Sequence, residues 1–410
     1  MKTVTLTQNI LLITLFNFFP IASPSQTFDA PQWVKDKLPR DVSALDRKDS
    51  LFFQSWIDQN ALLAIDYLIS KCKQHQLVVL GEMHEIQNNL LFIKDALPIL
   101  HRETGLNCLG LEVCNAEDNP DLERLVNAPT YDETLALSIA RSNNWHFWGW
   151  KEYWDLLRAV WQINQTVGPT QSRLKVVGIG RKMNLILDFK GGRGMLRDSI
   201  ETAAYKAQLP LLLGNDSLMA SEAEKEILQK GLRGLILVGN MHAFTHYRQP
   251  LVRDGKYVSQ VSPRMCYLLH KKYEDRIFQI TLHLDEMSPV IVDPSYNGPN
   301  PTLPALIETL MTRRAIGPIG FDVFCSPLGS LRDSASYYFH YQPTVVFSDV
   351  CRGYIVLVPW RKIQHCDWIP GFITPEMFKA NKDFFDARFN KKFSSADEVN
   401  EFFSYIGKPH

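Results

Sequence analysis

Two carboxylates and an imidazole stand close together after an apolar run of this sequence. In LVVLGEMHE, residues 77–85, the run ends at a glycine and is followed by Glu82, His84 and Glu85. Glycine allows the backbone to turn sharply or to approach a neighbour closely. Residues i and i+2 of an extended segment share a face, so the side chains of Glu82 and His84 should point to the same side. Carboxylates are rarely buried without a partner, which favours a functional interpretation of Glu82 over a packing one.

A second segment repeats this pattern. ILVGNMHA, residues 236–243, again has an apolar run, a glycine, a polar residue, a methionine and a histidine, which gives Asn240 and His242. A further apolar run, LGLEV, carries Glu112 near its end. If strands bring these three segments together, two imidazoles and two glutamates converge on one spot.

Such a set supports two kinds of chemistry. Neutral imidazoles and carboxylates are the usual ligands of a hydrolytic divalent metal ion with an open position, and Glu82, His84 and His242 are the candidate ligands. The same groups can act without a metal, one as general base on water and another as general acid. We predict a catalytic set that contains Glu82, His84, Glu112 and His242, and leave the need for a metal open.

Three other residues are candidates for substrate binding. Glu85 and Asn240 belong to the two repeated segments, and His146 lies among tryptophans in NNWHFWGW. For His146, packing or stacking against a substrate is favoured over metal ligation. The tryptophan-rich segment over 143–157 could line a bulky apolar pocket, but an ordinary helix-face core is the preferred interpretation.

Alternating apolar and amphipathic segments must position these side chains. Short runs rich in Leu, Val and Ile are typical of buried strands, and the candidates are LVVLG, NCLGLEV, LKVVGIG, GLILVG and RIFQITLHL. Helical spacing separates them, which predicts an α/β fold with a mainly parallel central sheet, helices on both faces and extra helical insertions. In such sheets ligands bind at the carboxyl ends of the strands, where the candidate residues follow.

Other segments give less regular signals. Helical spacing continues through residues 52–74, which predicts one helix there, and GMLRDSIETA also favours a helix. TVVFS and GYIVLVP are predicted as edge strands. The tail segment MFKANKDFFDARFNKKF is predicted to be helical and to pack on the main body.

Length and composition limit the class of protein. The chain has 410 residues with 44 basic and 44 acidic ones, and no basic run with interleaved aromatics, so a general nucleic-acid binder is not expected. The seven cysteines are odd in number and scattered, which gives no support to zinc-finger chemistry. Cys108 is expected to be an apolar core residue.

The first residues are typical of a secretory signal peptide. Lys2 is followed by an apolar stretch and then by small residues, and cleavage is expected after residue 25. We therefore predict a secreted or periplasmic protein with no integral membrane segment after cleavage. Residues 26–410 are predicted to form a single α/β domain with a C-terminal extension.

Four motifs in order carry a resemblance to a known family. The segments LGEMHE, LGLEV, GMLRDSIETA and LVGNMHA resemble motifs of the superfamily that contains erythromycin esterase, the haem-binding lipoprotein ChaN and the TIKI/TraB metalloproteases. The resemblance extends over about residues 75–285. It implies a site made of Glu82, His84, Glu112, Arg197 with Asp198, Asn240 and His242.

The family resemblance implies an activity and two candidate cofactors. It implies an exported hydrolase that activates water against an ester, lactone or peptide bond in a small-molecule or peptide substrate, with a divalent metal ion as a possible aid. Arg197 would then orient a carboxylate, and Arg197 or Asn240 would stabilise an oxyanion. The alternative is a haem- or iron-binding uptake protein without turnover, as ChaN implies.

Overall fold

The computed structural model describes most of the chain. It covers residues 29–142, 148–168, 171–181, 215–253, 256–283, 303–312, 317–389 and 391–406. The predicted signal peptide, the GMLRDSIETA helix, His146, Arg197 and Asp198 lie outside the described residues.

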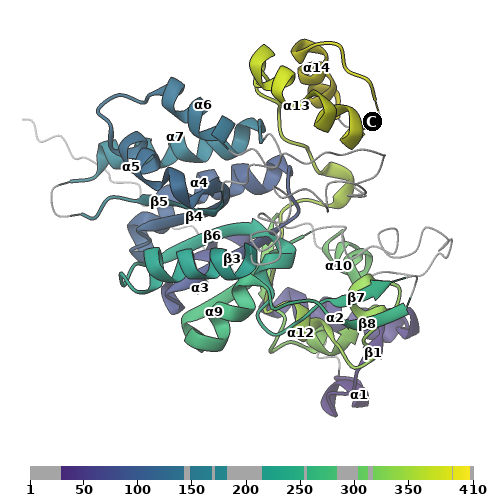
Figure 1. Ribbon diagram of the computed structural model, residues 1–410. Coiled ribbons are helices and arrows are strands. Elements are labelled where there is room, and N and C mark those ends of the chain that lie inside the picture. The colour runs from purple at the N-terminus through teal and green to yellow at the C-terminus, as the bar shows by residue number, and fades with distance from the viewer. Residues whose placement is uncertain are drawn as a thin grey trace, which may run out of the picture.

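An eight-stranded sheet forms the centre of the fold (Figure 1). Its strands are β2 (Leu62–Leu63), β3 (Leu77–Glu82), β4 (Cys108–Asn115), β5 (Lys175–Gly180), β6 (Gly234–Gly239), β9 (Ile277–Leu282), β10 (Ile319–Asp322) and β12 (Gly353–Val356). The order across the sheet is β2-β10-β12-β9-β3-β6-β4-β5. Only β10 pairs with its neighbours in antiparallel fashion, so the predicted mainly parallel sheet is confirmed.

Helices cover both faces of this sheet, as predicted. Val78 and Leu80 of β3 belong to a core cluster with α3 (Ala64–Gln74), α4 (Gln87–Thr104) and α7 (Lys151–Thr166). The alternate residues Leu77 and Val79 pack on the other face against α9 (Met265–Tyr273) and the helix over 215–228. Because both faces are covered, β3 is apolar at successive positions rather than at alternate ones.

The prediction of one continuous helix over residues 52–74 is wrong. It is two helices, α2 (Arg47–Asn60) and α3, with the short strand β2 between them. Leu62 and Leu63 lie at the sheet edge, where β2 pairs with Ile319 and Gly320 of β10, and both leucines are about half exposed. The helical spacing counted these two leucines, but pairing with a distant strand overrides it.

The two predicted edge strands are also corrected. TVVFS falls in a turn and the short helix α12 (Phe347–Val350). GYIVLVP does form a strand, β12, but it lies inside the sheet between β10 and β9. The edges are β2 and β5.

The C-terminal helices join the main core, as expected. They are α13 (Pro375–Phe389) and α14 (Ala396–Ile406). Phe403 of α14 stacks on Trp368 with ring centroids 4.2 Å apart, and Trp368 meets Trp150 at 5.0 Å. These rings belong to the cluster that also contains β3 and β4 residues. Trp150 and Trp154 are buried there, so this part of the tryptophan-rich segment is core, as preferred.

All seven cysteines are unpaired in the structure. Six are buried, and Cys325 is exposed. Burial raises the pKa of the Cys72 and Cys108 thiols to about 12, so both remain protonated at neutral pH. Cys108 therefore serves as a small apolar core residue, as predicted.

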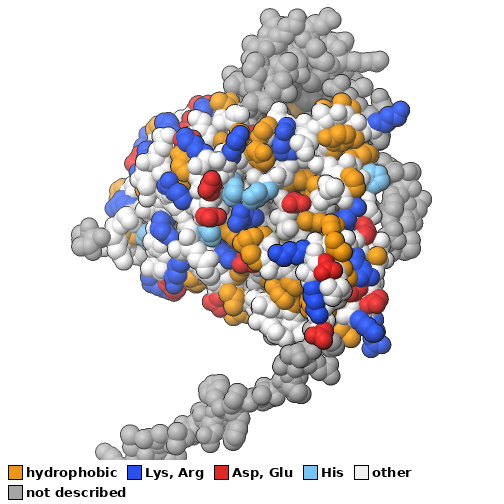
Figure 2. Space-filling view, turned by 90° about the horizontal axis from the view of Figure 1, so that it is seen from below, with side chains coloured by type: hydrophobic (Ala, Val, Ile, Leu, Met, Phe, Trp, Pro, Cys, Tyr) orange, Lys and Arg blue, Asp and Glu red, His pale blue; other side chains and the backbone are white. Residues whose placement is uncertain are grey.

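The described helices include none with the length and apolar character needed to cross a bilayer. Figure 2 shows basic and acidic side chains interspersed over one face of the molecule, without a large patch of a single sign.

Candidate functional site

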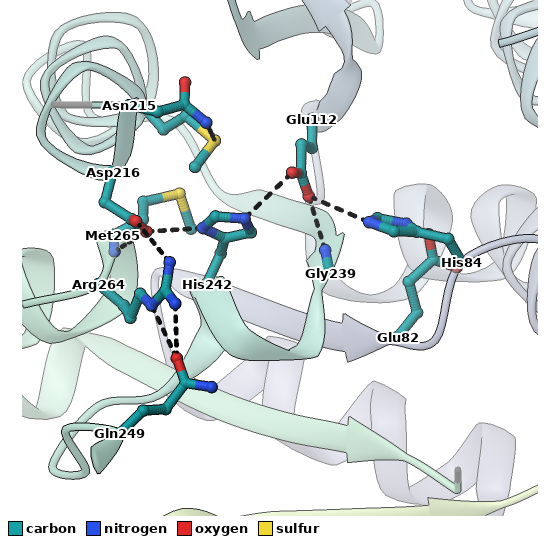
Figure 3. Close-up of polar contacts among 11 residues, drawn as sticks. Glu82, His84, Glu112, Asn215, Asp216, Gly239, His242, Gln249, Arg264 and Met265 are labelled. Carbon is teal, nitrogen blue, oxygen red and sulfur yellow. Dashed lines mark hydrogen bonds and ion pairs between the residues drawn. The ribbon is translucent and has the colours of Figure 1, made fainter. Parts of the chain in front are cut away.

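Three neighbouring strands bring the predicted catalytic residues together. β6 lies between β3 and β4, so the carboxyl ends of all three meet at one edge of the sheet. Glu82 is the last residue of β3, Glu112 lies in β4, and His242 lies in the 3-10 helix η5 (Asn240–Ala243) that follows β6. Figure 3 shows the two imidazoles on either side of the Glu112 carboxylate.

Glu112 is the link between the two histidines. Its Oε1 lies 3.3 Å from His242 Nε2, and its Oε2 lies 4.0 Å from His84 Nε2. Oε2 also accepts the backbone N–H of Gly239 at 2.6 Å. The longer distance is beyond a hydrogen bond, so His84 and Glu112 face each other without direct bonding.

Gly239 makes this arrangement possible. A Cβ atom at this position would lie 2.8 Å from His84 Nε2 and 3.6 Å from Glu112 Oε2. Gly81, at the corresponding place in the first segment, makes a similar close approach, because a Cβ there would lie 2.7 Å from Asn240 Oδ1. The glycine of each repeated segment therefore accommodates a side chain of the other segment.

Glu82 is a buried partner of His84. Its side chain is 1% exposed, and its Oε1 lies 3.1 Å from His84 Nδ1 and accepts the Tyr153 hydroxyl at 2.7 Å. Burial raises the pKa of Glu82, against the opposing effects of His84 and Tyr153. Within the described part of the chain, its Oε2 has no hydrogen-bond partner. Glu82 is thus shielded from solvent and acts on its surroundings through the His84 ring.

His84 itself is open to solvent on one side. Its side chain is 35% exposed, and its ring meets Trp148 edge-on with centroids 5.0 Å apart. The next residue, Glu85, has φ of +70°, a conformation that is strained for a residue with a side chain. The Glu85 N–H donates to the Tyr153 hydroxyl at 3.0 Å, and its carbonyl accepts the Cys366 N–H at 2.8 Å. These contacts hold the tight turn beside His84.

Asp216 is a site residue that sequence reasoning missed. Its Oδ1 lies 2.6 Å from His242 Nδ1 and also accepts the Met265 N–H at 2.8 Å. Its Oδ2 accepts Arg264 Nη1 at 3.2 Å. Asp216 stands outside any repeated pattern, and only the folded chain brings it to His242, so no sequence signal could have found it.

His242 and Asp216 each favour the charged form of the other. Burial by itself would lower the pKa of His242, but Glu112 and Asp216 outweigh burial and raise the pKa above the usual value. Burial likewise opposes ionisation of Asp216, yet His242 and Arg264 lower the pKa of this carboxyl. Both pKa shifts favour the ion pair of a protonated His242 with an ionised Asp216.

The other predicted residues lie differently. Asn240 is 2% exposed, and its Oδ1 accepts the Thr281 hydroxyl at 3.1 Å, so its side chain is turned into the interior beside β9. Glu85 is partly exposed next to His84. His146 and Arg197 lie outside the described residues, so their roles in substrate binding and catalysis stay predictions.

The described residues give no support to the predicted metal ligation by Glu82, His84 and His242. No group of three His, Cys, Asp or Glu side chains in the described ranges is arranged to hold a metal. In the predicted ligand set, both ring nitrogens of His242 face carboxylates, and Glu82 Oε1 is engaged by Tyr153 and His84. These side chains of the predicted ligand set are therefore already engaged by groups of the protein.

Fold and site define an α/β protein with two carboxylate–imidazole pairs at the carboxyl edge of its sheet. No family model and no curated protein matches the chain. Solved structures similar to it include a Bacillus cereus protein, with 12% identity, a TM-score of 0.46, and coverage of 75% of this chain and 97% of that one.

Two further similar structures correspond to the sequence resemblance. One is a mutant of an erythromycin esterase in its open conformation, with 13% identity, a TM-score of 0.43, and coverage of 78% of this chain and 96% of that one. The other is ChaN of Campylobacter jejuni with cofacial haem, with 17% identity, a TM-score of 0.30, and coverage of 53% and 86%. At these identities, any functional conclusion must come from the site itself.

Proposed function

We propose that this protein is a hydrolase in which His84 activates water against an ester, lactone or amide bond. The observation that supports this most is the pairing of His84 Nδ1 with the buried Glu82 carboxylate at 3.1 Å. A carboxylate that accepts Nδ1–H leaves the lone pair on Nε2, on the partly exposed ring. That nitrogen can take a proton from water as the water attacks a carbonyl carbon.

Burial favours His84 over Glu82 as the general base. Glu82 is 1% exposed, and its Oε1 is shared between Tyr153 and His84, so substrate and water cannot readily reach it. The role of Glu82 is to orient His84 and to stabilise the imidazolium that forms on it. His84 is the general base.

Glu112 completes the side of the site that faces His84. The Gly239 N–H and His242 fix its carboxylate, and its Oε2 lies 4.0 Å from His84 Nε2. A water molecule between these two atoms could donate one proton to His84 and the other to Glu112. The attacking oxygen would thus be oriented before reaction.

The walls of the site indicate the general class of substrate. Trp148 lies edge-on to His84 and offers an apolar surface to a small-molecule or peptide acyl group. Arg197 remains the candidate to stabilise the oxyanion. Secretion, predicted from the leader, is part of this proposal.

A panel of aliphatic esters, lactones and peptides tests the proposal. The purified chain should hydrolyse at least one class, with or without a chelator, and the His84→Asn variant should lose this activity. His340→Asn is the matched control, because His340 is exposed and its Nδ1 meets only the Ser334 carbonyl. If the chain hydrolyses none of these substrates and shows a Soret band when haem is added, the hydrolase proposal is wrong and the haem-binding alternative is favoured.

A further inference from the structure

The second imidazole of the site is held differently from the first. His242 Nδ1 lies 2.6 Å from Asp216 Oδ1, and its Nε2 lies 3.3 Å from Glu112 Oε1. The Nδ1 contact is a hydrogen bond to a carboxylate, and Nε2 lies at ion-pair distance from a second carboxylate, so both contacts favour a His242 ring with a proton on each nitrogen. His84 differs, because its Nδ1 lies 3.1 Å from Glu82 while its Nε2 is farther from Glu112, at 4.0 Å. The two histidines are therefore suited to opposite proton-transfer roles.

Asp216 is itself rigidly held (Figure 3). It accepts the Met265 N–H at the start of α9 at 2.8 Å and Arg264 Nη1 at 3.2 Å. Arg264 in turn donates from Nε and Nη2 to Gln249 Oε1 at 2.9 Å and 2.6 Å. A carboxylate fixed by a helix start and a clamped guanidinium fixes the His242 ring against it.

We propose that Asp216 is a positioning residue that keeps His242 protonated, so that His242 Nε2 donates its proton to the leaving group of the substrate. This inference rests on the proposed hydrolase function. As the bond from the carbonyl carbon to the leaving oxygen breaks, the electron pair stays on that oxygen, which takes the Nε2 proton. The proton that His84 took from water then restores His242, so the sum is the addition of one water molecule.

A proton donor matters only for some substrates. An aliphatic alkoxide or an amine is a poor leaving group and must be protonated as it departs, whereas a nitrophenolate leaves without a proton. The substrate class implied by the Asp216–His242 pair is therefore an ester or lactone of an aliphatic alcohol, or an amide, and not an activated ester.

The test compares two esters of the same acid with different leaving groups. Asp216→Asn should lower kcat for the ethyl ester about 100-fold, with KM nearly unchanged, and should affect the p-nitrophenyl ester little. Asp333→Asn is the matched control, because the Asp333 carboxylate also accepts a backbone N–H at a helix start, that of Leu303 at 2.9 Å. Among the described residues, no histidine bonds to Asp333. It should leave both reactions unchanged. Equal loss on both esters in Asp216→Asn, or no loss on either, overturns the inference.

A second measurement separates this inference from the hydrolase proposal. Nitrogen-15 NMR at pH 7 should show both His242 nitrogens protonated in the wild-type chain and only one in Asp216→Asn. If the wild type hydrolyses neither ester, the hydrolase proposal fails and the leaving-group role fails with it, but the spectrum still decides the positioning role. A wild-type spectrum with a single protonated His242 nitrogen contradicts that role.

Discussion

At the scale of single residues, two imidazoles of the site differ in what their carboxylates allow. Glu82 is buried and meets His84 at Nδ1, while Nε2 of the partly exposed ring faces Glu112 at 4.0 Å. Glu112 and Asp216 engage both nitrogens of His242. The first arrangement favours a base and the second an acid, and each can be tested by a single substitution.

Replacing the buried carboxylate should separate activity from stability. Glu82→Gln should lower kcat/KM by about 100-fold or more, because His84 loses the acceptor that directs its tautomer. Burial raises the pKa of Glu82, so a neutral side chain of the same shape should leave the free energy of unfolding unchanged or increase it. Urea unfolding and ester hydrolysis measure the two effects.

Another carboxylate–imidazole pair provides the control for Glu82→Gln. Glu308 Oε1 lies 3.0 Å from His283 Nε2, and His283 follows β9. Glu308→Gln removes the same kind of contact outside the site, so it should leave kcat/KM near the wild-type value. Equal loss of activity in both variants would mean that Glu82 acts only through the general integrity of the fold.

The raised pKa of His242 predicts a pH-dependent contribution to stability. The folded chain binds this proton more tightly than the unfolded chain, because Glu112 and Asp216 outweigh the effect of burial. The stabilisation is fully present below the usual value of 6.5 and is lost as pH rises through the folded pKa. Asp216, whose pKa is lowered, stays ionised in this window and adds no slope.

Urea unfolding of the wild type and of His242→Gln checks this prediction. Above pH 6.5 the wild type should lose unfolding free energy more steeply than the variant, at up to about 1.4 kcal/mol for each unit of pKa difference. Parallel curves would show that His242 has the same proton affinity in the folded and unfolded chains.

At the scale of elements, the sequence predicted local pattern well and distant pairing poorly. LVVLG and GLILVG were recognisable as strands because both their faces are buried. Glu82, His84 and His242, which end or follow these strands, lie at one site in the structure. β2 and β10 were missed, because a two-residue strand and a short run with a glycine carry little periodicity. Asp216 was missed for a different reason, since its partner is defined only by the tertiary fold.

Gly239 tests whether the close approach of β6 to His84 matters. In Gly239→Ala the new Cβ would lie 2.8 Å from His84 Nε2, at the far end of a side chain that can move away. We expect kcat/KM to fall at least about tenfold, because a displaced base loses its alignment with Glu112. The cost in unfolding free energy should stay within about 1–3 kcal/mol.

Gly168→Ala is the control for this substitution, since no atom lies within 4 Å of a Cβ built there. It should change neither activity nor stability appreciably. Wild-type activity in Gly239→Ala would show that the position of His84 is not critical.

At the scale of the whole molecule, the C-terminal helices are tied to the core that positions the site. Phe403 stacks on Trp368, and both belong to the cluster that contains β3 and β4 residues. The predicted single domain implies that this extension unfolds together with the sheet. The same cluster includes Trp148, which contacts His84, so packing links the tail to the site.

Truncation of one aromatic ring tests this coupling. Phe403→Ala should lower the free energy of unfolding by about 3–5 kcal/mol and leave a single cooperative transition. Tyr405→Ala, at a side chain that is 60% exposed on the same helix, should change it by less than about 0.5 kcal/mol. Two separate transitions in the wild type, by circular dichroism and tryptophan fluorescence, would contradict the single domain.

The central claim is that His84 Nε2 takes a proton from the attacking water, and chemical rescue measures it most directly. Because the His84 side chain is 35% exposed, free imidazole can enter the space that His84→Ala leaves. Hydrolysis of an aliphatic ester should fall by about 10²–10⁴-fold in this variant and recover in part, saturably, with added imidazole. A His84→Ala variant that hydrolyses the ester at the wild-type rate would contradict the claim.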